Sequence, residues 1–200
     1  MLKVAVFVSG GGTNLQALID AEKKGELGNA ELSLVVSNKP DAYALERAKN
    51  AGIDTAVVCR KDYADADAFC DQLLKIVKEN GISLIVLAGF LCILKGNLLK
   101  EYENRIINVH PSLIPSFCGD GFYGLKVHEK ALEYGVKVTG ATVHFVNDIT
   151  DGGKIIMQKA VEIKDDDTPE TLQKRVMEQA EWILLPSAVK MLSEKLEELK

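Results

Sequence analysis

Over its first 110 residues the chain alternates short apolar runs with helical patterns, and this alternation limits the possible folds more than any other feature. The apolar runs predict strands at 3–8, 31–37, 55–59, 83–88 and 105–109. Apolar residues at helical spacing predict helices near 15–24, 42–50, 65–79 and 95–102. Strands that alternate with helices form a parallel sheet with right-handed crossovers. The sequence therefore predicts an α/β fold whose ligands bind outside the carboxyl ends of the strands.

The second half of the chain has a different pattern, which predicts an antiparallel addition to that sheet. We expect a helix at 125–134, a strand at 136–146 and an antiparallel partner strand at 154–161. The C-terminal helix should begin with Thr168 as its N-cap and Pro169 as its first residue. Pro186 lies inside the same helical pattern, so we expect the helix to be bent or interrupted there.

Composition argues against several classes of protein. The net charge of −5 and a pI near 5.3 argue against a nucleic-acid surface. No apolar run reaches the roughly 18 residues of a membrane span, and the short apolar start is typical of a first strand. Four scattered cysteines indicate reduced thiols in a cytoplasmic protein rather than disulfides or a zinc site. The three histidines are widely separated and form no recognisable set of metal ligands.

The first predicted strand ends in a glycine-rich loop, residues 9–14, that leads directly into a helix. Glycines let backbone N–H groups approach an anion, and the helix N-terminus adds the positive end of its dipole. Thr13 and Asn14 can add side-chain donors. The loop matches neither the G-x-G-x-x-G fingerprint nor the P-loop. A tight turn with nothing bound is the alternative, but three consecutive glycines favour a phosphate site.

A second candidate site lies at the end of the strand predicted at 105–109. Asn108 and His110 are two residues apart, so on a strand their side chains point to the same side. Pro111 and Pro115 prevent the chain from continuing as a regular strand or helix. An amide donor and an imidazole can together stabilise a developing oxyanion. The alternative is a structural histidine whose ring bonds to the backbone.

An acidic loop, residues 147–153, joins the two predicted antiparallel strands and ends in two glycines. By itself this segment is typical of a solvated hairpin turn.

Together these segments resemble the phosphoribosylglycinamide formyltransferase family. The resemblance is carried by residues 8–16, 108–115 and 143–153, and residues 37–42 and 88–90 agree as well. It covers essentially the whole chain in the right order. It implies a formyltransferase-type Rossmann-like fold, with a mostly parallel sheet, an antiparallel C-terminal part and helices on both faces. It also implies one domain over residues 1–200, with a nucleotide-binding half (1–110) and a folate-binding and catalytic half (111–200).

The resemblance implies a reaction of de novo purine biosynthesis. The formyl group of 10-formyltetrahydrofolate, a co-substrate, is transferred to the amine of 5'-phosphoribosylglycinamide, without a metal. The implied partners are small molecules, not nucleic acid or a membrane, and the protein is expected in the cytoplasm as a monomer or homodimer.

The residues implied for this reaction fall into three groups. The catalytic residues are Asn108, His110 and Asp151, with His144 in support. The ribonucleotide would be bound by Gly12, Thr13, Asn14, Asn108 and Glu181. The folate would lie against Leu91, Cys92, Ile93, Leu94, Asp148 and Asp151. The sequence departs from the family at Cys92, where members often carry arginine, and at Trp182, where many carry histidine.

Two other functions are considered. A formyltetrahydrofolate hydrolase or a tRNA formyltransferase normally carries an extra domain, for which 200 residues leave no room. A non-catalytic nucleotide-binding module could use the glycine-rich loop alone, but it would leave His110 and Asp151 without a role.

Overall fold

The computed structural model describes residues 1–197, and its centre is a seven-stranded sheet with the strand order β3-β2-β1-β4-β5-β6-β7. The strands are β1 (Leu2–Val8), β2 (Ala30–Ser37), β3 (Asp54–Val57), β4 (Leu84–Leu87), β5 (Ile106–His110), β6 (Val138–Phe145) and β7 (Ile155–Glu162). Strands β1 to β5 are parallel, whereas β6 is antiparallel to β5 and β7 to β6. The predicted fold class, a mostly parallel sheet with an antiparallel C-terminal part, is confirmed.

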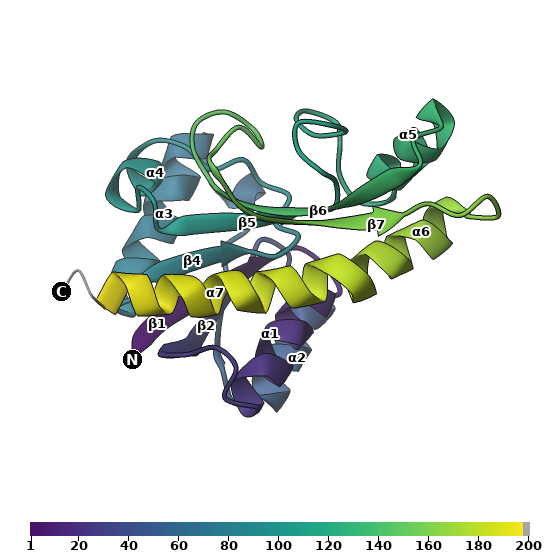
Figure 1. Cartoon of the computed structure of the whole chain (residues 1–200). Coiled ribbons are helices and arrows are strands. Elements are labelled where there is room, and N and C mark those ends of the chain that lie inside the picture. The colour runs from purple at the N-terminus through teal and green to yellow at the C-terminus, as the bar shows by residue number, and fades with distance from the viewer. Residues whose placement is uncertain (198–200) are drawn as a thin grey trace.

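Helices cover both faces of this sheet (Figure 1). They are α1 (Thr13–Lys23), α2 (Tyr43–Asn50), α3 (Ala66–Glu79), α4 (Asn97–Glu101), α5 (Leu125–Tyr134), α6 (Pro169–Val176) and α7 (Trp182–Glu197). One apolar core lies between the sheet and α1, α2, α6 and α7, and a second lies between the sheet and α3 and α4. Alternate residues of β1 enter the two cores, which explains its nearly unbroken apolar run. Within residues 1–197, no helix combines the length and apolar character needed to cross a membrane.

The C-terminal helix is interrupted, but the prediction that Pro186 interrupts it is wrong. The break is a π-helical segment, Met177–Glu181, and α7 then continues through Pro186. Pro186 lies inside α7, five residues after the π segment ends, in a helical stretch that is continuous from α6 through α7. The π segment contains Glu181, one of the residues expected to bind the ribonucleotide.

The strand order brings three chain segments to one rim of the sheet, as predicted. Strands β1, β4 and β5 are neighbours, and the strand order reverses beside β1, where β4 follows a crossover from β3. Their carboxyl ends lead into residues 9–14, 88–94 and 111–124. The Leu91 amide donates to Ser9 Oγ at 2.9 Å, which joins two of these segments directly. The β6–β7 loop, residues 146–154, rises beside the 111–124 segment (Figure 1).

Candidate active site

The pairing of β5 with β6 brings an amide and two imidazoles together. In the antiparallel register Asn108 lies opposite His144, and His110 lies opposite Thr142. Residues that face each other in such a pair project to the same side of the sheet. The Asn108 Nδ2 atom is 3.2 Å from His144 Nε2. Asn108, His110 and His144 all line one cavity, so the two-residue spacing seen in the sequence does direct the first two side chains to a common site.

A backbone carbonyl determines which ring nitrogen of His144 carries the proton. The Phe145 carbonyl oxygen lies 2.8 Å from His144 Nδ1, so we assign the ring proton to that nitrogen. The Nε2 atom can then accept a hydrogen bond from one of the two N–H groups of Asn108. The second N–H of Asn108 remains for a ligand. His144 thus orients Asn108 as well as facing Asp151.

The β6–β7 loop is exposed at residues 147–150 and 152, but it delivers the Asp151 side chain to the same place. Its backbone is left-handed at Asp151, with φ of 53°, a conformation that costs energy for a residue other than glycine. At Gly153 a Cβ atom would lie 1.7 Å from the Phe145 carbonyl oxygen, so only glycine fits. The folded-back loop leaves the Asp151 side chain 11% exposed, with its carboxylate oxygens 3.6 Å from His110 Nδ1 and 3.6 Å from His144 Nε2. The loop is therefore a largely exposed connection between two antiparallel strands, as local chemistry indicates, but its Asp151 side chain is turned into the site.

Burial and neighbouring charges oppose each other at the two central groups. Burial raises the pKa of Asp151, but the two histidine rings in their protonated forms, together with the Gly119 amide, outweigh it and lower the pKa below its ordinary value. Burial lowers the pKa of His110 below 6.5, although Asp151 and the Phe117 carbonyl favour the charged ring. The Phe117 oxygen lies 2.9 Å from His110 Nε2, so both ring nitrogens face acceptors. A carboxylate whose ionised form is favoured therefore faces a histidine whose neutral form is favoured by burial.

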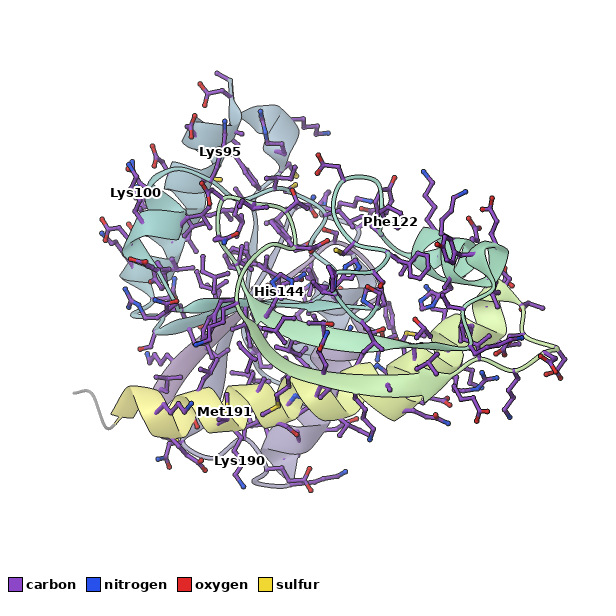
Figure 2. The ribbon with its side chains drawn as sticks, turned by 45° about the horizontal axis from the view of Figure 1, so that its top comes forward. Lys95, Lys100, Phe122, His144, Lys190 and Met191 are labelled. Carbon is purple, nitrogen blue, oxygen red and sulfur yellow. The ribbon has the colours of Figure 1, made fainter. Side chains whose placement is uncertain are left out.

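These groups lie on the wall of a cavity of about 500 Å³. Figure 2 shows His144 near the centre of the molecule, beneath the loops, and Phe122 in the loop that precedes α5. Four apolar side chains that line the cavity are each more than half exposed: Leu91, Ile93, Tyr123 and Ile149. Exposed apolar side chains around a concave site are typical of a surface that an apolar ligand covers.

The structure brings the residues predicted to bind folate to this cavity. Its lining includes Leu91, Cys92, Ile93, Leu94, Asp148 and Asp151. Phe122 and Tyr123 also line it, and sequence reasoning assigned them no role. The only signal available for them was the presence of aromatic residues in a glycine-rich segment.

The Cys92 side chain is a packed thiol. Its Sγ accepts a hydrogen bond from Asn38 Nδ2 at 3.0 Å. Burial raises the pKa of Cys92 and so keeps the thiol neutral, although the Asn38 hydrogen bond and nearby positive charges oppose this.

The glycine-rich loop lies outside the lining of that cavity and leads into α1. Gly12 has φ of 72°, and a Cβ atom there would come within 2.6 Å of Ala44 Cβ, so packing alone requires this glycine. Gly10 and Gly11 are both exposed, and a Cβ atom added at either would have nothing within 4 Å. Among the described residues no side chain caps α1, so its first N–H groups can bind an anion.

The π segment Met177–Glu181 packs against this helix start. Asn14 Nδ2 donates to Glu181 Oε2 at 2.7 Å, and the Thr13 hydroxyl points at Met177 Sδ, 3.7 Å away. Glu181 is only 6% exposed, and burial raises its pKa, opposed by the Asn14 hydrogen bond. The structure thus brings together Thr13, Asn14 and Glu181, which lie far apart in the sequence.

His128 was not singled out from the sequence. It is fully buried on α5, and neither ring nitrogen has a hydrogen-bond partner within residues 1–197. Burial, with a further contribution from nearby His110, lowers the pKa of His128 to about 4. The folded protein therefore holds this ring neutral at pH 7.

This neutral histidine predicts a pH dependence of stability. Below about pH 6.5 the ring is protonated in the unfolded chain but stays neutral in the folded protein down to about pH 4. Unfolding then takes up a proton, so stability falls as the pH falls through this window, by on the order of 3 kcal/mol. We expect His128→Leu to reduce this loss. Thermal unfolding at pH 7 and pH 4.5 measures it, and equal losses in the variant and the wild type would contradict the assignment.

Comparison with known proteins adds a consistent set of similarities. A family model described as formyl transferase matches residues 2–189. Phosphoribosylglycinamide formyltransferase of Haemophilus influenzae is 40% identical over 194 residues, which cover 97% of this chain and 88% of that protein. The trifunctional purine biosynthetic protein adenosine-3 of Gallus gallus is 46% identical over 192 residues, but the chain spans only 18% of its length. The crystal structure of phosphoribosylglycinamide formyltransferase from Bacillus halodurans superposes with a TM-score of 0.90 at 38% identity, covering 98% of both chains.

Proposed function

Because this chain belongs to the formyl transferase family, we propose that it transfers the formyl group of 10-formyltetrahydrofolate to the amine of 5'-phosphoribosylglycinamide. The products are the formylated ribonucleotide and tetrahydrofolate, in de novo purine biosynthesis. The observation that carries the proposal is the meeting of Asn108, His110 and Asp151 beside the cavity. Full-length similarity to the Haemophilus enzyme supports the choice of acceptor. The free cysteines are consistent with a cytoplasmic enzyme.

The ribonucleotide is proposed to bind between the start of α1 and Asn108. Its phosphate would accept hydrogen bonds from the backbone and side chains of Gly12, Thr13 and Asn14, where the helix dipole is positive. Glu181, held by Asn14, would accept a hydrogen bond from a ribose hydroxyl. This arrangement would direct the glycinamide amine along the rim towards Asn108.

The folate is proposed to bind in the 500 Å³ cavity. The exposed apolar side chains of Leu91, Ile93 and Ile149 offer contacts for flat rings, and backbone groups near Asp148 can read the edge of the pterin. Cys92 is proposed to contribute its backbone and not a charge, because its thiol is neutral and bonded to Asn38.

The chemistry is addition of an amine to a formyl carbon followed by expulsion of the folate nitrogen. Negative charge develops on the formyl oxygen, where the free N–H of Asn108 and a protonated His110 would stabilise it. Asp151 would accept the proton of the attacking amine, directly or through water, and that proton would pass to the departing folate nitrogen, which leaves as the N–H of tetrahydrofolate. The negative charge of Asp151 would also favour the charged form of His110. His144 would hold the Asn108 amide in the donating orientation. No step requires a metal.

Acceptor specificity tests this function. We expect purified protein to form tetrahydrofolate when given 10-formyltetrahydrofolate and 5'-phosphoribosylglycinamide, but not when methionyl-tRNA replaces the ribonucleotide. Turnover with the tRNA, or with water as the acceptor, would instead indicate one of the other formyl-transferring activities.

Glu181→Gln separates substrate binding from folding. Glutamine can still accept the Asn14 hydrogen bond, but an NH2 group replaces the second carboxyl oxygen that is proposed to accept from the ribose, so the KM for the ribonucleotide should rise roughly tenfold. Since burial raises the pKa of Glu181, its ionised form is disfavoured in the folded state, and stability is lost as the pH rises through that pKa. The variant should therefore unfold at an equal or higher temperature at pH 7.

The matched control for this variant is Glu178→Gln. Glu178 lies in the same π segment, but its side chain is 47% exposed and pairs with Lys174. An unchanged ribonucleotide KM in Glu181→Gln, or an equal rise in both variants, would contradict the role proposed for Glu181.

A further inference from the structure

The loop between β5 and α5, residues 116–124, touches both ionisable members of the proposed catalytic group through its backbone. The Phe117 carbonyl oxygen accepts from His110 Nε2 at 2.9 Å. Two residues later, the Gly119 amide donates to Asp151 Oδ2 at 2.8 Å. Among residues 1–197 this is the shortest polar contact of the Asp151 carboxylate, since both histidine nitrogens are 3.6 Å away. The loop therefore holds the carboxylate more closely than the histidines do.

We propose that Gly119 is a positioning residue for formyl transfer, whose amide fixes the Asp151 carboxylate between His110 and His144. This inference rests on the proposed function, since it assigns Asp151 a part in the chemistry. Gly119 acts through Asp151 and needs no contact with the reacting atoms. A carboxylate with only the two histidines beside it could rotate, because neither histidine nitrogen is within hydrogen-bond distance.

The backbone of the loop is shaped for this contact. Phe117 and Gly119 both have positive φ, of 51° and 88°. Such a conformation is strained at Phe117, and strain of this kind is concentrated at functional sites. The Phe117 ring is held by edge contacts with Phe122 and Tyr134, with ring centroids 6.4 and 6.0 Å apart. Aromatic packing thus stabilises the turn that directs the Gly119 amide at Asp151.

The segment that leads into this loop, residues 111–115, is anchored to the sheet. Buried Thr142 on β6 donates to the Ser112 carbonyl at 2.7 Å and accepts from the Ile114 amide at 3.1 Å. Since Thr142 lies directly opposite His110, the loop and the histidine share one support. The far part of the loop, with Phe122 and Tyr123, lines the cavity. A ligand in the cavity would therefore contact the same loop that holds the carboxylate.

The chain offers a matched pair of variants for testing Gly119. Gly119 and Gly121 have nearly the same φ, 88° and 87°, and at both positions an added Cβ would have nothing within 4 Å. Alanine therefore imposes the same backbone strain at either position, but only Gly119 donates to Asp151. We expect Gly119→Ala to lower kcat roughly ten- to hundredfold, with a much smaller effect of Gly121→Ala.

The pKa of the Asp151 carboxyl distinguishes loss of the Gly119 contact from a general effect of strain in the loop. The groups that titrate around it are His110, His144 and Cys118. Alanine keeps the amide, but a side chain is strained at φ of 88°, so we expect the backbone to relax and to carry the amide away from Asp151 Oδ2. Because that amide helps to lower the Asp151 pKa, Gly119→Ala should raise it, and Gly121→Ala should not. Carbon-13 NMR titration of the carboxyl in the unliganded protein measures this without any assay of activity. In the assay, the acid limb of the kcat profile should move to higher pH in Gly119→Ala alone.

The outcomes separate this inference from the proposed function. If wild type transfers the formyl group but the two alanine variants behave alike in kcat and in the Asp151 titration, the positioning role is wrong and the function stands. If the Asp151 pKa rises only in Gly119→Ala while wild type transfers no formyl group, the contact is real but the function is wrong. A Gly119→Ala protein that does not fold, judged by its thermal transition against Gly121→Ala, would show that the residue serves the fold and overturn the proposal.

Discussion

Replacing Asp151 by asparagine is expected to lower kcat for formyl transfer roughly a thousandfold. Asparagine keeps the size of the side chain and can accept from the Gly119 amide, but it cannot take a proton from the attacking amine. It also removes the negative charge that favours a protonated His110. Steady-state assays with both substrates saturating measure the effect, and ribonucleotide binding should be retained because the glycine-rich loop is unchanged.

The control for this variant removes the same charge elsewhere. Asp165→Asn changes a side chain that is 98% exposed, and it should keep full activity. The stability of Asp151→Asn provides a second check. Because the folded protein lowers the pKa of Asp151, the carboxylate stabilises the fold at neutral pH, and this contribution is lost as the pH falls through that pKa. Activity within tenfold of wild type would contradict the proton-accepting role.

His110→Ala should lower kcat roughly a hundredfold or more, with little change in either KM. The imidazole is proposed to stabilise charge that develops on the formyl oxygen only in the transition state, so its loss should not weaken substrate binding. The kcat and the two KM values, measured at pH 7 to 8, distinguish this from a binding role. A large rise in KM with kcat preserved would show that His110 binds substrate and does not stabilise the oxyanion.

A second buried imidazole provides the comparison for His110. His128 is close enough to His110 for the His110 ring to contribute to the lowered pKa of His128, but His128 lies outside the lining of the cavity. His128→Leu should therefore keep kcat near that of wild type at neutral pH. Equal losses in the two variants would indicate that both rings serve packing.

Periodicity predicted the fold well because burial on both faces produces simple patterns. The helix expected at 125–134 is α5, and Gly135 follows it in a left-handed conformation. Thr168 caps α6, where its hydroxyl accepts from the Thr171 amide at 3.3 Å. We expected the interruption at Pro186 because proline lacks the N–H that a regular helix needs, whereas the structure has it at a π segment, for which the sequence offers no comparable signal.

Local sequence patterns predicted the site less well than the fold. The spacing of Asn108 and His110 on one strand predicts their common direction, and the structure agrees. For Asp151 local chemistry indicated a solvated turn, and only the resemblance to a family pointed to catalysis. The position of Asp151 depends on its left-handed backbone and on the close approach of Gly153 to Phe145. The spacing of apolar residues predicts neither feature. The contacts of Phe117 and Gly119 could not be predicted, because they are made by backbone atoms, which are the same in almost every residue type.

The most direct test of the central claim is formyl transfer from 10-formyltetrahydrofolate with and without 5'-phosphoribosylglycinamide, followed by the appearance of tetrahydrofolate. The account predicts turnover that requires the ribonucleotide and yields its formylated product in equal amount. Folate turnover without the ribonucleotide would indicate a hydrolase, and no turnover despite binding of the ribonucleotide would leave only a nucleotide-binding module.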